Sequence, residues 1–244
     1  MRLKLIVVLG ILFLVSQVNA EEKLVLKNQK DKVSYSIGLN IGRNLANDLK
    51  KQSIDIDPNI LAKGIQDALA GAKPLLTDQE IQETMVAFQK EMMAKLEEMA
   101  KKNKADGEAF LAENKKKEGV KTLPSGLQYK VIKAGTGKKP KADDTVTANY
   151  RGTLIDGTEF DSSYKRGQPA TFPVSGVIPG WTEALQLMEE GAKWQLFIPS
   201  SLAYGERGTG GLVGPNAILI FEVELVSIKE KTQESKPENK QEKK

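Results

Sequence analysis

The 244-residue sequence contains no cysteine and no histidine. Without these residues the chain cannot form a disulfide, a thiolate zinc site or a redox pair, and it cannot build a Ser-His-Asp or Cys-His nucleophilic site. Aromatic residues are also sparse, at 6% of the chain. Most hydrolase classes are therefore excluded, and any chemistry must use carboxylates, hydroxyls, backbone amides or a shaped apolar surface.

The first twenty residues have the composition of a secretory signal peptide. Arg2 and Lys4 form a short positive start, residues 5–15 are almost all apolar, and residues 18–20 place small or branched side chains before Glu21. The apolar run is too short to span a bilayer with margin, which makes a retained membrane anchor the weaker alternative. We predict a signal peptide over residues 1–20 and a mature chain without an integral membrane segment.

The net charge gives no sign of a nucleic-acid partner. Without Arg2 and Lys4, the chain has 34 basic and 32 acidic residues, and residues 229–244 hold six lysines against four glutamates. The folded part is therefore close to neutral, and we predict no nucleic-acid binding. Residues 229–244 have almost nothing to bury and are predicted to form a disordered polar tail.

The stretch from Asp31 to about Lys117 has the periodicity of helices. Apolar residues recur every fourth position from Val33 to Leu49, which predicts a first amphipathic helix. Asp57-Pro58 is a typical helix start and Gly71 a typical helix end. Thr77 and Glu80 form a capping box that predicts the start of a third helix, about 40 residues long, with Asn103 and Gly107 as its weak points.

A helix of that length cannot bury its apolar stripe against two short helices along its whole length. The helical half is therefore expected to pair with a second copy of the chain. Four of the six methionines lie on the long helix, where they fit either an ordinary helical core or a client-binding groove. We predict a helical dimerisation domain over residues 21–76 and a long connecting helix over residues 77–118.

From Leu123 onward the apolar residues no longer recur with the period of a helix but at every second position. This alternation predicts strands, and Asp156-Gly157 between two such runs suggests a type I′ hairpin. One short helix is expected around residues 181–189, opened by Pro179-Gly180 and closed by Gly191. The fold class is thus α+β, and residues 119–228 are predicted to form an antiparallel sheet wrapped around one short helix.

The sparse aromatic residues gather in this second half. Each suits a small hydrophobic core when taken alone. Their neighbours are less ordinary, because a carboxylate follows Phe160 directly and a glycine-rich loop follows Tyr204. Six aromatic residues of this half are singled out as candidates: Tyr150, Phe160, Phe172, Trp181, Tyr204 and Phe221.

The second half resembles the FKBP family of peptidyl-prolyl cis-trans isomerases between about Gly126 and Ile228. Five blocks stand in the order and spacing of that family: Tyr150-Arg151-Gly152, Asp156-Gly157 with Phe160-Asp161-Ser162-Ser163, Val177-Ile178-Pro179-Gly180-Trp181, Ala203-Tyr204-Gly205 and Phe221-Glu222-Val223-Glu224-Leu225. The helical half, with residues 35–38 and the join at residues 123–129, resembles the macrophage infectivity potentiator branch. Members of that branch are periplasmic or surface-associated dimers of Gram-negative bacteria.

The resemblance implies an isomerase that needs no cofactor and no metal. Trp181 would form the floor of a pocket, and the Ile178 amide and the Tyr204 hydroxyl would donate hydrogen bonds to peptide carbonyls. Tyr150 and Arg166 would hold Asp161. The implied catalytic positions are Tyr150, Asp161 and Tyr204, and the implied substrate-binding positions are Phe160, Arg166, Phe172, Val177, Ile178, Trp181, Leu212 and Phe221.

The same resemblance implies partners and a location. Unfolded or proline-containing polypeptides would be substrates, a second copy would bind through the N-terminal helices, and a macrolide of the FK506 type would be a candidate ligand. The implied location is the periplasm of a Gram-negative bacterium, with the outer membrane or cell surface as the other site that the branch allows. Ala170, Thr209, Leu212 and Val213 depart from common family residues, which bears on substrate preference and macrolide affinity.

Rotation of an X-Pro bond is compatible with a chain that lacks histidine and cysteine. The barrier of about 18–20 kcal/mol comes from amide resonance, and no bond is made or broken when it is crossed. We hypothesise that an apolar pocket removes the water that stabilises the planar, more dipolar amide. In this hypothesis Asp161 fixes neighbouring groups and the local field, which is favoured over a role as a general base.

Two other kinds of site fit the sequence less well. Asp156, Glu159 and Asp161 do not follow the spacing of a calcium loop. The glycine-rich residues 205–211 lack the Gly-Lys-Ser/Thr ending of a phosphate-binding loop. Two functions remain open and can coexist: an isomerase that assists the folding of exported proteins, and a dimeric chaperone whose helical cleft holds unfolded clients.

Overall fold

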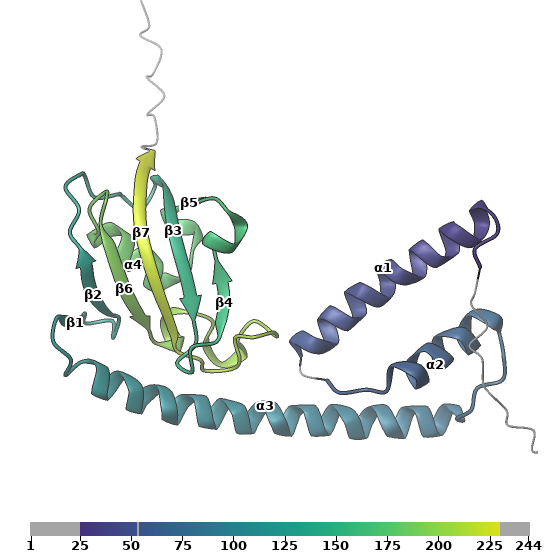
Figure 1. Ribbon diagram of the computed structural model, residues 1–244. Coiled ribbons are helices and arrows are strands. Elements are labelled where there is room, and N and C mark those ends of the chain that lie inside the picture. Colours follow the sequence, from purple (N-terminus) through teal and green to yellow (C-terminus); the bar gives the residue numbers. More distant parts are fainter. Residues whose placement is uncertain (1–24, 53, 230–244) are drawn as a thin grey trace, which may run out of the picture. The chain divides into compact units, whose positions relative to one another are not determined.

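The computed structural model describes residues 25–52 and 54–229. The predicted signal peptide (1–20) and all but the first residue of the predicted tail (229–244) lie outside the described residues. The chain divides into two compact units, one ending at Asn47 and the other beginning at Asp48. Helices come first and an antiparallel sheet follows, so the fold is α+β as predicted (Figure 1). Within the described ranges, no helix combines the length and apolar character needed to cross a membrane.

The first two helices follow the signals in the sequence. Helix α1 spans Gln29–Lys51, and much of its predicted apolar stripe is exposed, including Val33, Ile37 and Ile41. Helix α2 spans Pro58–Ala70. Asp57 caps α2 by accepting hydrogen bonds from two first-turn amides, and Gly71 ends it with a left-handed φ of 62°.

Helix α3 spans Asp78–Asn114 and runs through Gly107 without a break. Thr77 opens it with the predicted capping box: its hydroxyl accepts from the Glu80 amide at 3.2 Å, and its own amide donates to the Glu80 carboxylate at 2.8 Å. The helical pattern of the sequence continues to about Lys117, but the helix ends three residues earlier, at Asn114. A long-range contact explains the earlier end, because the buried Asn114 side chain donates to Gln128 at 3.0 Å, and Gln128 in turn donates to the Leu111 carbonyl at 2.9 Å.

The C-terminal part of α3 packs against the sheet domain. The Asn103 side chain donates to the Pro215 carbonyl at 2.8 Å, and the Asn216 side chain donates to the Ala100 carbonyl at 3.3 Å. A Cβ atom added to Gly107 would lie 2.6 Å from Cγ1 of Ile218. Gly107 therefore lets the helix approach the domain closely, and the helix continues through this weak point without a break.

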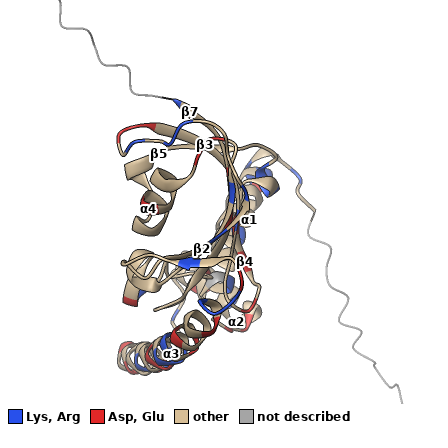
Figure 2. Cartoon of the chain, turned by 90° about the vertical axis from the view of Figure 1, so that its left-hand side faces the viewer, with Lys and Arg blue, Asp and Glu red and all other residues tan. Residues whose placement is uncertain are grey.

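The sheet follows α3 and is antiparallel throughout. Its described strands lie in the order β1-β2-β6-β7-β3-β4, and β5 also pairs with β3. The sheet curves, and helix α4 (Pro179–Leu187) lies against its concave face (Figure 2). The strands are β1 (Val120–Thr122), β2 (Gln128–Lys133), β3 (Thr145–Thr153), β4 (Glu159–Ser162), β5 (Ala170–Pro173), β6 (Lys193–Ile198) and β7 (Leu219–Lys229).

The hydrophobic core fills the space between the sheet and α4. Leu185 and Met188 from the region of the helix are fully buried against Leu196 of β6 and Val223 of β7. These positions alternate with more exposed ones along the strands, as the period-two pattern predicted. The core thus fixes α4, which carries part of the site described below.

Two local predictions in this half need correction. Helix α4 opens at Pro179, as the Pro179-Gly180 pair predicted, but it ends at Leu187, two residues before the predicted Glu189. The hairpin between β3 and β4 is not type I′, which needs two residues with positive φ. Gly157 has a φ of 87° but Asp156 has no positive φ; instead the Asp156 carboxylate accepts from the Thr158 amide at 2.9 Å.

The close contact at Gly107 leads to a test of how α3 is held. Gly107→Ala should lower the free energy of unfolding of the sheet domain by about 1–2 kcal/mol, since the added methyl group overlaps Ile218. In an Ile218→Ala background, the same change should be neutral or stabilising by up to about 1 kcal/mol, because only the gain in helix propensity remains. Urea unfolding followed by the fluorescence of Trp181 and Trp194 measures both values; a stabilising Gly107→Ala in the unmodified background would contradict the contact.

Candidate active site

A hollow of about 440 Å³ opens between the sheet and the N-terminus of α4. We call it the aromatic pocket. Strands β3, β4, β5 and β7, helix α4 and the loop after β6 all contribute to it, so residues far apart in the sequence meet there. Its lining consists of Tyr150, Asp161, Phe172, Gly176, Val177, Ile178, Trp181, Tyr204 and Phe221.

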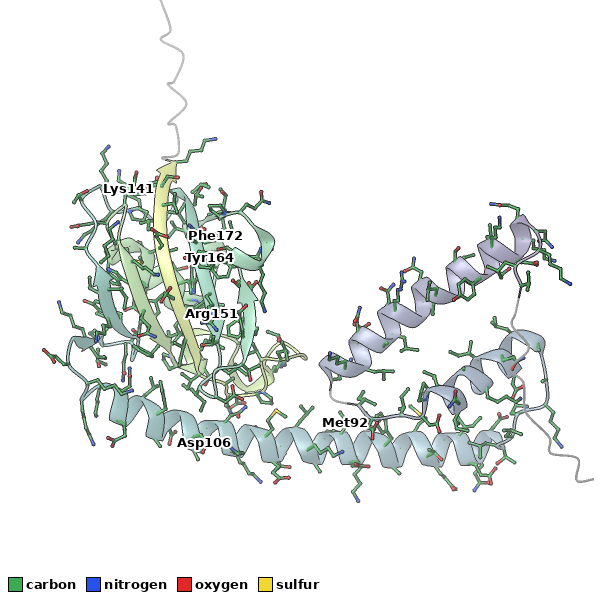
Figure 3. The ribbon with its side chains drawn as sticks, viewed as in Figure 1. Met92, Asp106, Lys141, Arg151, Tyr164 and Phe172 are labelled. Carbon is green, nitrogen blue, oxygen red and sulfur yellow. The ribbon has the colours of Figure 1, made fainter. Side chains whose placement is uncertain are left out.

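Trp181 forms the floor of the aromatic pocket. Its side chain is 4% exposed, and its ring packs edge-on against three others. The centroid distances are 5.2 Å to Tyr150, 5.4 Å to Phe172 and 5.2 Å to Phe221, with interplanar angles of 70–86°. This edge-to-face geometry is the favoured one for aromatic pairs, so the rings stabilise one another's positions. Figure 3 labels Phe172, which comes from β5.

Two glycines allow this packing. Gly152 on β3 pairs with Phe221 of β7 and with Asp161 of β4. A Cβ atom on Gly152 would lie 2.7 Å from the Phe221 ring and 2.8 Å from the Phe160 ring. A Cβ on Gly180 would lie 2.5 Å from Ile198 of β6, so the first turn of α4 can sit close to the sheet only without a side chain there.

A hydrogen-bonded triad forms one side of the pocket. The Tyr150 hydroxyl donates to the Asp161 carboxylate at 2.6 Å. Arg166 donates to the same carboxylate and to the Tyr150 oxygen, both at 2.5 Å, and its guanidinium group lies 5.3 Å from the centre of the Tyr150 ring. The buried Ser163 hydroxyl accepts from the Tyr150 amide at 2.9 Å, which ties β3 to the turn that carries Arg166.

The triad fixes the charge states of its members. Burial works against ionisation of Asp161, but hydrogen bonds from Tyr150 and Arg166 and attraction to the guanidinium group outweigh it, so the pKa of Asp161 lies below its ordinary value of 3.8. Burial, followed by the hydrogen bond to Asp161, raises the pKa of Tyr150 above its ordinary 10.0. At neutral pH the site therefore holds a carboxylate, a neutral phenol and a guanidinium.

Two hydrogen-bond donors at the pocket have no acceptor among the described residues. The Ile178 amide lies at the N-cap position of α4, and the Tyr204 hydroxyl belongs to a side chain that is 43% exposed. The indole nitrogen of Trp181 is buried and also without a partner there. The pocket thus combines apolar walls with donors that could bind a carbonyl oxygen, an arrangement suited to holding a peptide.

The structure brings most of the predicted residues to one place. Eight of the eleven line the aromatic pocket. Phe160 and Leu212 instead line an adjoining hollow, which shares Asp161 and Tyr204 with the pocket. Arg166 lines neither hollow but holds Tyr150 and Asp161. The eight are Tyr150, Asp161, Phe172, Val177, Ile178, Trp181, Tyr204 and Phe221.

Sequence reasoning assigned no role to three residues that shape the site. Gly176 lines the pocket, Gly152 admits two phenylalanine rings, and Ser163 joins β3 to the following turn. The sequence contains two signals for these roles. Ser175-Gly176 is a pair typical of turns, and Gly152 lies inside a strand pattern, where a glycine often marks the close approach of another part of the chain. Of the residues that depart from the family pattern, Thr209 and Val213 line the adjoining hollow with Leu212.

Comparison with protein families gives two matches that together cover most of the chain. Residues 30–131 match the domain amino-terminal to FKBP-type peptidyl-prolyl isomerase. Residues 136–226 match the FKBP-type peptidyl-prolyl cis-trans isomerase domain. The second match contains every residue that lines the aromatic pocket.

Individual relatives are similar over nearly their whole length. The outer membrane protein MIP of Legionella longbeachae is 54% identical over 86% of this chain and 90% of that protein. The peptidyl-prolyl cis-trans isomerase Mip of Coxiella burnetii is 47% identical over 84% of this chain and 90% of its own length. The crystal structure of FkpA from Escherichia coli has a TM-score of 0.58 and 45% identity, and the match covers 84% of this chain and 99% of that one.

The depressed pKa of Asp161 makes a pH-dependent contribution to stability. A carboxyl group whose pKa falls on folding stabilises the protein above its ordinary pKa, and this stabilisation is lost as the pH falls through the lower, folded value. Asp161→Asn should therefore be less stable than the unmodified protein at pH 7, and the difference should shrink below about pH 4. Urea unfolding at a series of pH values measures this difference in the free energy of unfolding. Asp143→Asn, at an exposed aspartate, is the control. If the difference in free energy of unfolding between Asp161→Asn and the unmodified protein stayed constant down to pH 2, the ionised triad would be contradicted.

Proposed function

This chain belongs to the FKBP-type peptidyl-prolyl cis-trans isomerase family, and from that premise we propose that it rotates X-Pro bonds in the aromatic pocket. The observation that carries the proposal is the convergence of four edge-packed rings with two unpaired donors in a single hollow. The proline ring of a substrate would lie on the Trp181 floor. No nucleophile is required, since the reaction makes and breaks no bond.

The apolar walls supply the first part of the proposed mechanism. The planar amide is more dipolar than the twisted one and is better stabilised by water. Rings from Tyr150, Phe172 and Phe221 around the Trp181 floor exclude that water, which raises the energy of the planar amide relative to the twisted one. The rate enhancement would come from this shift, with no covalent intermediate.

Fixed polar groups supply the second part. The Ile178 amide and the Tyr204 hydroxyl are free to bind the carbonyl oxygens on the two sides of the rotating bond. Donors held in position favour the rotated state without the reorganisation that water needs. Asp161 would act through the field of its carboxylate, which Tyr150 and Arg166 hold ionised and in one orientation. Its depressed pKa makes it a poor general base at neutral pH.

We place the activity in the periplasm, where the enzyme would assist the folding of exported proteins. Residues 1–20 have the features of a secretory signal peptide, and one relative carries the name of an outer membrane protein. Substrates would be unfolded polypeptides that contain proline. A macrolide of the FK506 type would compete for the same apolar pocket, with an affinity that depends on Ala170, where many family members have an aromatic residue.

The helical part of the chain supports a homodimer. Residues 21–76 would form the dimerisation domain, residues 77–118 the connecting helix and residues 119–228 the isomerase domain. In α1, Ile37 and Ile41 are 56% and 57% exposed, and in α2 Leu69 is 85% exposed. Apolar side chains repeated at helical spacing and left in solvent are typical of an interface between copies.

The same exposed surface favours a second function alongside the first. A dimer with apolar helix faces could hold unfolded clients while the isomerase domain acts on them. Four methionines of α3, including Met85 and Met93 at 57% and 64% exposure, give that surface adaptable side chains. Suppression of aggregation by the whole chain, measured with pocket variants that lack isomerase activity, would separate holding from catalysis.

The roles of the polar groups can be tested with conservative variants. Tyr204→Phe removes one neutral hydrogen bond and should lower kcat/KM on a proline tetrapeptide by about threefold to tenfold, which corresponds to roughly 0.5–1.5 kcal/mol. Asp161→Asn removes the charge and should lower it by about tenfold or more, as expected for charge-assisted hydrogen bonds. Tyr164→Phe, at an exposed tyrosine outside the pocket, is the matched control. Full turnover by Asp161→Asn would exclude a catalytic role for the carboxylate.

The dimer can be tested by sedimentation of residues 21–244. The unmodified chain should sediment as a dimer, and Ile37→Glu with Ile41→Glu should yield monomers, because charges in an apolar interface lose their hydration without gaining partners. Ile132→Glu, which places a charge at an exposed isoleucine of the sheet domain, should remain dimeric. Tetrapeptide turnover should be unchanged in all three proteins. A dimeric Ile37→Glu, Ile41→Glu chain would rule out α1 as the interface.

A further inference from the structure

The aromatic pocket is one of three hollows that adjoin on the same domain. The second, which we call the loop hollow, has a volume of about 400 Å³ and shares Asp161 and Tyr204 with the aromatic pocket. The third, which we call the helix groove, has a volume of about 480 Å³ and shares Leu212 with the loop hollow. Tyr204 and Leu212 thus stand at the two junctions, and both are exposed apolar side chains, at 43% and 53%.

The helix groove lies between α3 and the sheet domain. One wall is the face of α3 that carries Met99 and Lys102, and the opposite wall is the turn after β3, from Leu154 to Asp156. The buried Ile218 and the half-buried Ala217 complete the lining from the segment before β7. Figure 3 labels Asp106, which lies on the part of α3 next to the sheet domain, whereas Met92 lies nearer the start of that helix.

The groove is formed before any ligand binds. The hydrogen bonds from Asn103 to Pro215 and from Asn216 to Ala100 join its helix wall to the segment that carries Ile218. A Cβ atom on Gly214 would lie 2.6 Å from the Met99 sulfur, so helix and loop are in direct contact there. A rigid groove binds a flexible chain at a lower entropic cost than a surface that must first be assembled.

The chemistry of the groove fits a mixed, mainly apolar polypeptide. Met99 is 44% exposed, Leu154 and Ile155 are half-buried, and the charged groups at the rim are Lys102, paired with Asp106 at 2.5 Å, and Asp156. One cation beside two carboxylates gives no strong preference for a charged ligand. Apolar side chains with a polar rim are typical of surfaces that bind peptides without strict sequence requirements.

We propose that the loop hollow and the helix groove bind the polypeptide that flanks the isomerised proline, so that α3 forms part of the substrate site. The proposal rests on the function proposed above, because the aromatic pocket supplies the point from which the chain extends. A hollow of 440 Å³ is sized for a drug-like ligand, so the rest of a protein substrate must lie outside it. The path from the aromatic pocket across Tyr204 and Leu212 leads that chain through the loop hollow to the helix groove.

The test compares a short and a long substrate in the full mature chain. The variant is Met99→Gln with Ile155→Ser, which makes both walls of the helix groove polar without touching the aromatic pocket. Activity is measured on a proline tetrapeptide and on an unfolded, disulfide-free protein whose refolding is limited by one prolyl bond. We expect kcat/KM on the unfolded protein to fall by about fivefold, a loss that corresponds to partial burial of two apolar side chains, while kcat/KM on the tetrapeptide stays the same.

The matched control is Val226→Gln with Val131→Ser, which replaces two exposed apolar side chains of the sheet domain with polar ones at positions outside the three hollows. It should retain both activities. An unchanged rate on the unfolded protein in the groove variant would overturn the proposal. An equal loss on both substrates would do so as well, since the groove would then act through the pocket. Failure of the proposed function looks different: the unmodified chain would then have no activity on the tetrapeptide.

A second measurement does not depend on the variants. The tetrapeptide is extended by about eight residues on one side of proline or on the other, a reach of roughly 26 Å when fully extended. One of the two extended peptides should bind more tightly than the tetrapeptide and shift the backbone amide resonances of residues 99–106 and 154–156. Shifts confined to the aromatic pocket with both extended peptides would overturn the proposal.

Discussion

The site depends on the contact between the Trp181 indole and three rings that arrive from different strands. Tyr150, Phe172 and Phe221 each meet it edge-on at 5.2–5.4 Å. Trp181 stands in the first turn of α4, and the position of that turn depends on the close approach of Gly180 to Ile198. A shift of α4 along the sheet would therefore separate the rings and at the same time move the Ile178 amide, which lies just before the helix. The N-terminus of α4 therefore determines both the packing of the rings and the position of the Ile178 amide donor.

The polar side of the site has fixing contacts of its own. Arg166 lies on a short 3-10 turn after β4, and its guanidinium group joins Asp161 to the Tyr150 oxygen. Since Tyr150 also belongs to the ring cluster, it is the residue through which the apolar and the ionic parts are coupled. The Tyr150 hydroxyl need not react, but Asp161 and Arg166 both bind it, and these hydrogen bonds link the ionic part of the site to the ring cluster.

Much of this arrangement could be predicted from the sequence where the signal is local. Asp57 and Thr77 marked helix starts because their side chains cap amides within one turn, and Gly71 marked a helix end because its backbone adopts a left-handed φ. The end of α3 was missed because it depends on Gln128, which is distant in sequence. The hairpin type was missed because Asp156 binds the Thr158 amide and so needs no positive φ. The pocket residues came from the family resemblance, whereas the roles of Gly152 and Ser163 depend on contacts with other strands, which only the folded chain shows.

The charge states of the triad have a consequence for where such a catalyst can work. Its carboxylate remains ionised below the ordinary range for aspartate, its phenol remains neutral above the ordinary range for tyrosine, and the sequence has no histidine to titrate between them. The working surface therefore neither gains nor loses a proton when the medium turns from neutral to moderately acidic. With no thiol in the chain, oxidants also find no cysteine to modify. A catalytic site of this kind is insulated from moderate changes in the acidity of its surroundings.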